Sequence, residues 1–137
     1  MVLVDTSVWV DVFRDESGAR RDTLAAALEG EPIVLTRFNA LEMLQGCRDE
    51  REWSLLASYL EGQDYLDLSS EAWQHAARIY YNLRRMGRTV RSPIDCCIAQ
   101  AAMEHDVLLL HRDTDFETIA QIRPLRQARI TWQVAPG

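Results

Sequence analysis

The sequence contains no lysine, few cysteines and no long apolar segment. All 15 basic residues are therefore arginines. Cys47, Cys96 and Cys97 show neither a CxxC spacing nor a histidine partner at zinc-finger spacing, so we interpret them as reduced, packed thiols. No segment approaches the roughly 20 apolar residues that a membrane-spanning helix needs, and the N-terminus lacks the features of a signal peptide. We expect a soluble, cytoplasmic protein that does not enter a membrane.

The length and composition fit one folded domain. A chain of 137 residues buries enough surface to hold a core without disulfides or metals. Hydrophobic residues make up 47% and charged residues 26%, which is typical of globular proteins, so we expect a single domain over residues 1–137. The net charge of -6 argues against a broadly basic surface that coats nucleic acid. A nuclease remains open, because bound cations would neutralise its carboxylates.

Short apolar runs alternate with helical patterns along the chain. The predicted strands cover residues 2–4, 32–35, 65–68 and 107–110, with an edge strand at 130–132. The predicted helices cover about residues 6–13, 21–28, 38–47, 51–60, 71–86, 93–105 and 114–120. This alternation predicts an α/β fold with a mainly parallel central sheet that helices cover on both faces.

Four acidic residues are placed to meet in one pocket. Asp5 directly follows the first strand, and Asp113 follows the strand that ends at residue 110. In parallel sheets the binding crevice lies beyond the carboxyl ends of the strands, so both side chains should reach it. Asp95 lies in the first turn of a helix, where the helix dipole favours a negative charge. Glu42 lies at the border of the apolar face of its helix and can reach the pocket edge.

Each acid also has a simpler structural interpretation. Capping the helix that follows could be the sole role of Asp5. Thr6 or Ser7 could also cap this helix. Asp113 could cap the helix at residue 114, and the other two acids could be a first-turn residue and a solvated helix residue. These separate roles do not explain why four acids should converge on one edge of the fold. We therefore favour a functional cluster.

A cluster of carboxylates requires a counter-charge. Two carboxylates about 4 Å apart repel each other by ~4 kcal/mol at an effective dielectric constant near 20, so four are unfavourable without cations or protons. The hard cations Mg²⁺ and Mn²⁺ prefer such oxygen ligands and can activate water for phosphodiester hydrolysis. His75, His105 and His111 share no spacing that indicates a transition-metal site.

Four motifs resemble those of the PIN-domain ribonucleases, specifically the VapC-type toxins of bacterial toxin–antitoxin pairs. The motifs are Val4-Asp5-Thr6-Ser7, the segment ALEMLQG at 40–46, the segment PIDCCIAQA at 93–101, and Arg112-Asp113-Thr114-Asp115-Phe116. One Asp-Thr-Ser alone is weak evidence. Four motifs in this order over almost the whole chain are strong evidence.

The resemblance implies a three-layer α/β/α fold and an endoribonuclease that cuts RNA, such as tRNA, with a metal-activated water. By the resemblance, the Mg²⁺ or Mn²⁺ ligands would be Asp5, Glu42, Asp95 and Asp113, with Ser7 and Asp115 as auxiliary groups. The family's toxins are held inactive by a cognate antitoxin. A homodimer is a further expectation at the level of the family.

The sequence departs from the family pattern at two places. His111 stands where family members commonly carry Thr or Ser, which puts a hydroxyl contact near Asp113 in doubt. Cys96 and Cys97 replace the small residues that usually follow the third acid, which we expect to affect packing only.

Several arginines are candidates for binding RNA phosphates, because a guanidinium group can pair with a phosphate through two hydrogen bonds. These candidates are Arg84, Arg85, Arg88, Arg91 and Arg112. The alternative for each is a solvated charge near the end of a helix.

Two other classes of protein could place acids at strand ends. A phosphoaspartate-type phosphotransfer domain needs a lysine across the pocket, and this chain has none; the related phosphatases need an acid where Ser7 stands. A non-catalytic protein could use the acidic pocket only to bind basic side chains of a partner. Metal-dependent RNA cleavage that is lost in Asp5→Asn would separate a nuclease from the second alternative.

Overall fold

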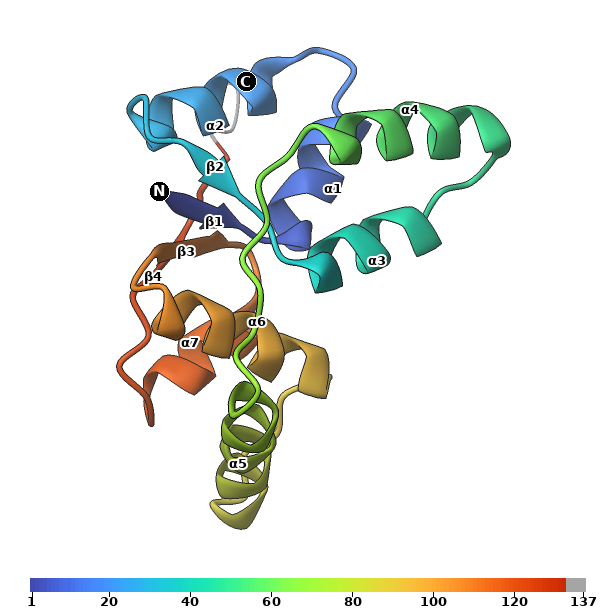
Figure 1. The fold of residues 1–137 in the computed structure, drawn as a ribbon. Coiled ribbons are helices and arrows are strands. Elements are labelled where there is room, and N and C mark those ends of the chain that lie inside the picture. Colours follow the sequence, from blue (N-terminus) through green and yellow to red (C-terminus); the bar gives the residue numbers. More distant parts are fainter. Residues whose placement is uncertain (133–137) are drawn as a thin grey trace.

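A computed structural model describes residues 1–132 of the chain and shows a central parallel sheet (Figure 1). Its strands are β1 (Val2–Val4), β2 (Ile33–Val34), β3 (Leu108–His111) and β4 (Gln127–Arg129). Their order in the sheet is β2-β1-β3-β4, and every pairing is parallel. The carboxyl ends of β1 and β3 are in register, since Val4 is paired with Leu110. The residues that follow these two strands therefore begin side by side.

Seven helices connect and cover the strands in the described part of the chain. They are α1 (Thr6–Arg14), α2 (Ala19–Leu28), α3 (Arg37–Gln45), α4 (Glu50–Glu61), α5 (Ala72–Arg85), α6 (Pro93–Glu104) and α7 (Thr114–Ala120). In α5, Ala72, Ala76, Ile79 and Leu83 recur every three or four residues and form its buried face. In α6, Pro93 occupies the first turn and the Ser92 hydroxyl caps the free N–H of Ile94.

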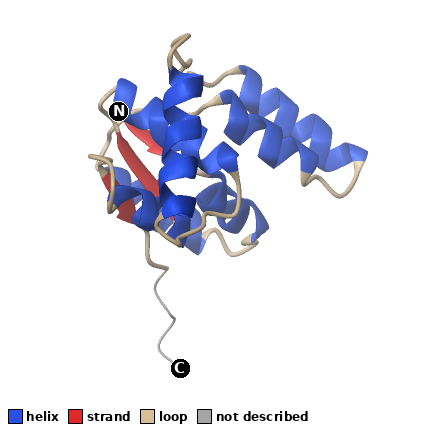
Figure 2. Cartoon of the chain, turned by 90° about the horizontal axis from the view of Figure 1, so that it is seen from below, coloured by secondary structure: helices blue, strands red, loops and turns tan. Residues whose placement is uncertain are grey.

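Alternate strand residues enter two different cores. Leu3 and Leu109 pack with residues of α5, α6 and α7, whereas Val4 and Leu110 pack with residues of α1, α2, α3 and α4. Figure 2 shows the strands with helices on both sides. The three-layer α/β/α arrangement with a parallel sheet, expected from the sequence, is therefore confirmed.

Two predicted strands are wrong. Residues 65–68 form only one bridge, between Tyr65 and Leu35, because the partner segment leaves the sheet at Thr36, which caps α3. The edge strand lies at Gln127–Arg129 and not at 130–132. This strand is polar, with partly or fully exposed residues, so its hydrophobicity does not reveal it.

The other elements lie close to their predicted positions, and α7 has the predicted bounds. No helix within residues 1–132 is both long enough and apolar enough to span a bilayer.

Candidate active site

Asp5 lies at the point where β1 ends and α1 begins. Its backbone N–H donates to the carbonyl of Leu110 at 2.9 Å, which fixes it beside β3. One carboxylate oxygen, Oδ2, accepts from the backbone N–H of Ser7 at 3.0 Å and from the Ser7 hydroxyl at 2.7 Å. Asp5 thus caps α1, as the simpler interpretation has it, and Thr6 and Ser7 do not. Capping also holds the carboxylate at the carboxyl edge of the sheet, so both roles are compatible.

Asn39 of α3 holds the other oxygen of Asp5 and was not among the residues predicted from the sequence. It is completely buried, and its Nδ2 donates to Asp5 Oδ1 at 3.2 Å and to Thr6 Oγ1 at 3.1 Å. Its Oδ1 accepts from the Thr36 backbone at 3.0 Å and hydroxyl at 2.7 Å in a capping box. The Thr-x-x-Asn spacing before an apolar helix could have indicated the cap. It could not have indicated the contact with Asp5.

Glu42 lies one turn after Asn39 and faces the same place. Its Oε1 accepts from the Thr6 hydroxyl at 3.2 Å, and its side chain is half-buried. Burial, followed by the charge of Asp5, raises the pKa of Glu42. The border position on α3 that the helical geometry predicted therefore brings this acid beside Asp5.

Asp95, Asp113 and Asp115 form the tightest group of acids. One carboxylate oxygen from each lies within 4.8 Å of the others, a separation at which one cation can bind all three. Asp95 belongs to the first turn of α6, Asp113 caps α7, and Asp115 lies in the first turn of α7. Asp115, predicted as an auxiliary group, thus lies as close to Asp95 and Asp113 as a ligand would.

These five acids make up what we term the carboxylate cluster: Asp5, Glu42, Asp95, Asp113 and Asp115. Burial raises the pKa of Asp5, and the charge of Asp113 adds to the rise against the hydrogen bonds from Ser7. Burial also raises the pKa of Asp95 to about 9, with further contributions from a hydrogen bond to Asp115 and from the charges of Asp113 and Asp5. Neighbouring carboxylates thus contribute to the raised pKa of Asp5, Glu42 and Asp95, and the structure brings together the four acids predicted from the sequence.

His111 takes over a contact at the end of β3. Its ring is completely buried beside Phe116, its Nδ1 accepts from the backbone N–H of Asp113 at 3.1 Å, and its Nε2 lies 2.7 Å from Oε1 of Gln127. Because Nδ1 accepts, Nε2 carries the proton and donates to Gln127. An imidazole nitrogen thus supplies the acceptor for Asp113, at the place where the family commonly has a hydroxyl.

Ser7 joins the two halves of the site. Its hydroxyl donates to Asp5 and accepts from the backbone N–H of Arg112 at 2.9 Å. It therefore ties the start of α1 to the loop after β3, which carries Asp113. This contact supports the auxiliary role that the resemblance implied for Ser7.

Among the predicted RNA-binding arginines, Arg91 reaches the carboxylate cluster. Its Nη2 lies 2.9 Å from Asp113 Oδ2, and its backbone N–H donates to Asp115 Oδ2 at 3.0 Å. Arg112 instead points to Asp11 at 2.6 Å and to the ring of Trp132. Arg84, Arg85 and Arg88 are exposed at and beyond the end of α5.

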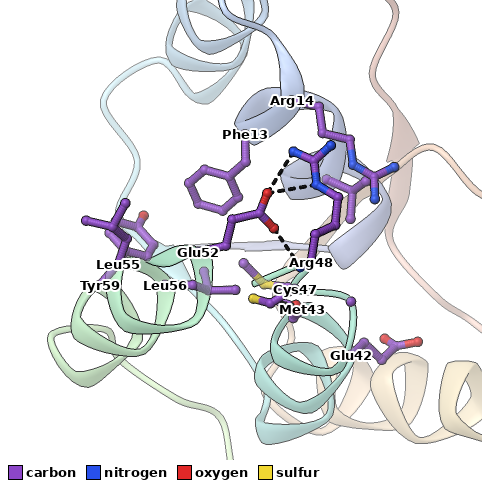
Figure 3. Close-up of a pocket in the computed structure, with 12 residues that line it drawn as sticks. Phe13, Arg14, Glu42, Met43, Cys47, Arg48, Glu52, Leu55, Leu56 and Tyr59 are labelled. Carbon is purple, nitrogen blue, oxygen red and sulfur yellow. Dashed lines mark hydrogen bonds and ion pairs between the residues drawn. The ribbon is translucent and has the colours of Figure 1, made fainter. Parts of the chain in front are cut away.

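A groove of about 300 Å³ begins at the edge of the cluster, between α1, α3 and α4 (Figure 3). Phe13, Leu55 and Tyr59 form an apolar wall, and Figure 3 shows Arg48 bound to Glu52 at the start of α4. Glu42 lines the groove at its other end, as Figure 3 also shows. The groove and the carboxylate cluster therefore share this acid.

The residues present suit a hard divalent cation. All candidate ligands are carboxylate oxygens, which Mg²⁺, Mn²⁺ and Ca²⁺ prefer over nitrogen or sulfur. Burial raises the pKa of Asp5, Glu42 and Asp95, and the charges of neighbouring carboxylates add to the rise. A bound cation would offset the repulsion among these carboxylates.

Comparison with known proteins agrees with this architecture. The family model for the PIN domain matches residues 2–122. The chain is 36% identical to VapC ribonuclease Mb1587 of Mycobacterium bovis over 131 residues, which cover 93% of this chain and 98% of that protein. Its fold is similar to VapBC-1 from nontypeable Haemophilus influenzae, with a TM-score of 0.75, 15% identity, and coverage of 94% and 98% of the two chains. It is also similar to VapBC-5 from Mycobacterium tuberculosis, a member of the VapBC family of toxin-antitoxin systems, with a TM-score of 0.62, 22% identity, and coverage of 93% and 95%.

Proposed function

Because the chain belongs to the PIN-domain family, we propose that it is a metal-dependent endoribonuclease and the toxin of a VapC-type toxin–antitoxin pair. The observation that carries the proposal is the carboxylate cluster at the carboxyl ends of β1 and β3. Related proteins named VapC ribonuclease align with nearly the whole chain. Burying several acids together costs stability, and such costly clusters are found mainly at functional sites.

We propose that Asp5, Glu42, Asp95 and Asp113 hold Mg²⁺ or Mn²⁺ and that Asp115 joins them. Bound there, the cation would lower the pKa of a water molecule and stabilise the oxygen that leaves phosphorus. The chain's own residues would set the geometry. Ser7 and Asn39 keep Asp5 oriented, and the ring of His111 holds the backbone of Asp113.

A carboxylate that does not bind the cation with both oxygens can accept the proton of the attacking water. Burial raises the pKa of Asp95 to about 9, so this carboxyl carries a proton at neutral pH in the metal-free protein and could accept the water's proton only after losing its own. The same carboxyl would release that proton when a cation binds. The products would be a 3′-hydroxyl and a 5′-phosphate, with no covalent enzyme intermediate.

We further propose that a cognate antitoxin blocks the site. The groove between α1, α3 and α4 leads to Glu42, so an apolar segment bound in the groove could place a basic side chain among the acids. The contact of Arg91 with Asp113 and Asp115 supports this idea, because it demonstrates that the cluster accommodates a guanidinium group. The family resemblance supports a homodimer, a cytoplasmic location and a structured RNA such as tRNA as substrate.

The test is to map 5′ ends in total RNA after brief induction of the wild type and of Asp5→Asn. New 5′ ends that appear with the wild type only are expected. Asp22→Asn provides a matched control, because Asp22 is an exposed acid on α2. A protein that only binds a partner through its acids would give the same 5′ ends in all three samples.

A further inference from the structure

The arginines of this acidic protein are unevenly distributed. Residues 72–94 contain five of the 15 arginines and no acid. Four of the five, Arg78, Arg84, Arg85 and Arg88, are exposed on α5 and in the loop after it. Arg123, in the segment after α7, lines the same cavity as Arg78 and Arg85. We refer to these five residues, Arg78, Arg84, Arg85, Arg88 and Arg123, as the α5–α7 arginine surface.

Ion pairing does not neutralise this surface. Within residues 1–132, eight of the 15 arginines form ion pairs with carboxylates. Five of the other seven make up the α5–α7 arginine surface. A protein with a net charge of -6 thus concentrates its uncompensated positive charge in one place. Such a patch attracts polyanions.

Three of these arginines line an open cavity of about 380 Å³. Arg78 and Arg85 line it from α5, and Arg123 lines it from the segment after α7. The guanidinium of Arg78 lies 4.9 Å from the ring centre of Tyr81, and Arg123 Nη1 donates to its neighbouring carbonyl at 3.0 Å. These contacts restrain two of the three guanidinium groups. Phosphate oxygens suit such a group of donors, because a guanidinium can bind them through two hydrogen bonds.

The α5–α7 arginine surface is continuous with the carboxylate cluster. Helix α7 starts at the cluster and ends beside the cavity, and its seven residues span about 10 Å. Arg88 donates to Gln121 at the far end of α7, whereas Arg91, three residues later, reaches Asp113 and Asp115 at the near end. A strand with its reacting phosphate at the cluster could therefore extend along α7 to the cavity.

We propose that the α5–α7 arginine surface is a second binding site for RNA, which holds the phosphodiester backbone on one side of the cut. This inference rests on the proposed ribonuclease function and names the surface that holds its substrate. Recognition there is of phosphates and not of bases, because the charged groups that line the cavity are guanidinium groups. The side chains of Tyr81 and Met86 offer apolar contacts to a ribose or a base.

The test compares two double variants of the full chain, each made in the inactive Asp5→Asn background. Arg85→Gln/Arg123→Gln removes two charges from the cavity, and Arg21→Gln/Arg51→Gln removes two exposed charges from α2 and α4. Binding of a fluorescent single-stranded RNA of 20 nucleotides is measured by anisotropy at several salt concentrations. Loss of two phosphate contacts should make the plot of log affinity against log salt less steep by about 1.4. If the variant and its parent bind equally at 1 M salt, the variant should therefore bind about 25-fold more weakly at 0.1 M salt. The control should bind like the parent.

Cleavage by the same double variants in the active protein adds a second readout. A long RNA should show a raised KM with kcat within about twofold, whereas a substrate of three nucleotides, too short to reach the cavity, should show no change. Thermal melting checks that both variants fold.

If the wild type cuts RNA but the cavity variant binds RNA with unchanged affinity and salt slope, the second binding site is wrong and the ribonuclease function stands. Loss of antitoxin binding with unchanged RNA binding would identify a protein interface and also overturn the proposal. If the wild type neither binds nor cuts RNA, the ribonuclease function itself fails.

Discussion

Charged side chains gather in two regions of the molecule that differ in burial and in hydrogen bonding. In the carboxylate cluster, Asp5 and Asp95 are only 4% and 7% exposed, and Asp5 accepts several hydrogen bonds. In the α5–α7 arginine surface, four of the five arginines are exposed, and none pairs with an acid within residues 1–132. Burying like charges is unfavourable, whereas exposed arginines remain hydrated.

This difference separates two kinds of function. Hydrogen bonds fix the positions of the buried carboxylates, as a reaction at a single phosphorus atom requires. The exposed arginines can adjust to a flexible polyanion, as binding of a backbone requires. Changes in the cluster should therefore affect turnover and metal binding, and changes in the arginine surface should affect affinity.

Removal of divalent metal should have the largest effect. We expect EDTA to abolish RNA cleavage and Mg²⁺ or Mn²⁺ to restore it, because every candidate ligand is a carboxylate oxygen. Initial cleavage rates after dialysis against each metal measure this. Recovery with Zn²⁺ alone, while Mg²⁺ and Mn²⁺ stay inert, would contradict the assignment of a hard cation.

Asp95→Asn should lower kcat by about 1,000-fold or more while it stabilises the metal-free protein. At neutral pH the folded metal-free protein must take up a proton on Asp95, which costs free energy. Asparagine is neutral and avoids this cost, but it removes a ligand of the cation. A gain of 1 kcal/mol in the free energy of unfolding would raise Tm by about 3–5 °C in a domain of this size. Single-turnover cleavage and thermal melting in EDTA measure the two effects. A marked fall in Tm would mean that Asp95 mainly supports the fold.

Asn39→Ala should weaken metal binding by about 10- to 100-fold, because groups that orient a ligand typically have this effect. It removes the donor to Asp5 and leaves the N–H of Thr36 without its acceptor, so stability should also fall by about 1–3 kcal/mol. Thr36→Ala is the control, since it removes the cap of α3 but keeps the amide that contacts Asp5. Calorimetric titration with Mn²⁺ compares them. Equal weakening in both variants would show that the cap, not the contact with Asp5, matters.

The role of Asn39 shows where sequence reasoning ends. The four acids could be predicted because each directly follows a strand, begins a helix or lies on a helix border, and these positions follow from local patterns. The contact of Asn39 with Asp5 joins residues 34 positions apart, and only the packing of α3 against α1 creates it. Strand β4 was misplaced for a similar reason, since its polar residues are held by pairing with β3 and not by their own hydrophobicity.

The stability of the metal-free protein should fall as the pH rises. The folded-state pKa of Asp95 is about 9 and that of an unfolded aspartate is near 3.8, so folding holds a proton that the unfolded chain releases. This contribution to stability is complete below about pH 4 and is lost progressively up to about pH 9. At about 1.4 kcal/mol per pH unit, Tm in EDTA should therefore decrease by about 10 °C or more between pH 5 and pH 8, and Asp95→Asn should flatten the trend. An unchanged slope in Asp95→Asn would assign the pH dependence to other groups.

Inhibition by the antitoxin should weaken as Mg²⁺ rises, and we expect this effect to be the smallest, a few-fold in apparent affinity. A basic side chain of the partner and the cation would compete for the same carboxylates, as Arg91 already occupies Asp113 and Asp115. Linkage requires each to weaken the other by the same factor. The measurement is a titration of RNA cleavage with the partner at low and at saturating Mg²⁺. The variant Arg48→Gln separates docking in the groove from competition at the carboxylate cluster, because Arg48 lines the groove and pairs with Glu52. That variant should lower partner affinity equally at both Mg²⁺ concentrations. Equal inhibition of the wild type at low and saturating Mg²⁺ would mean that the partner acts from the groove and leaves the carboxylates open.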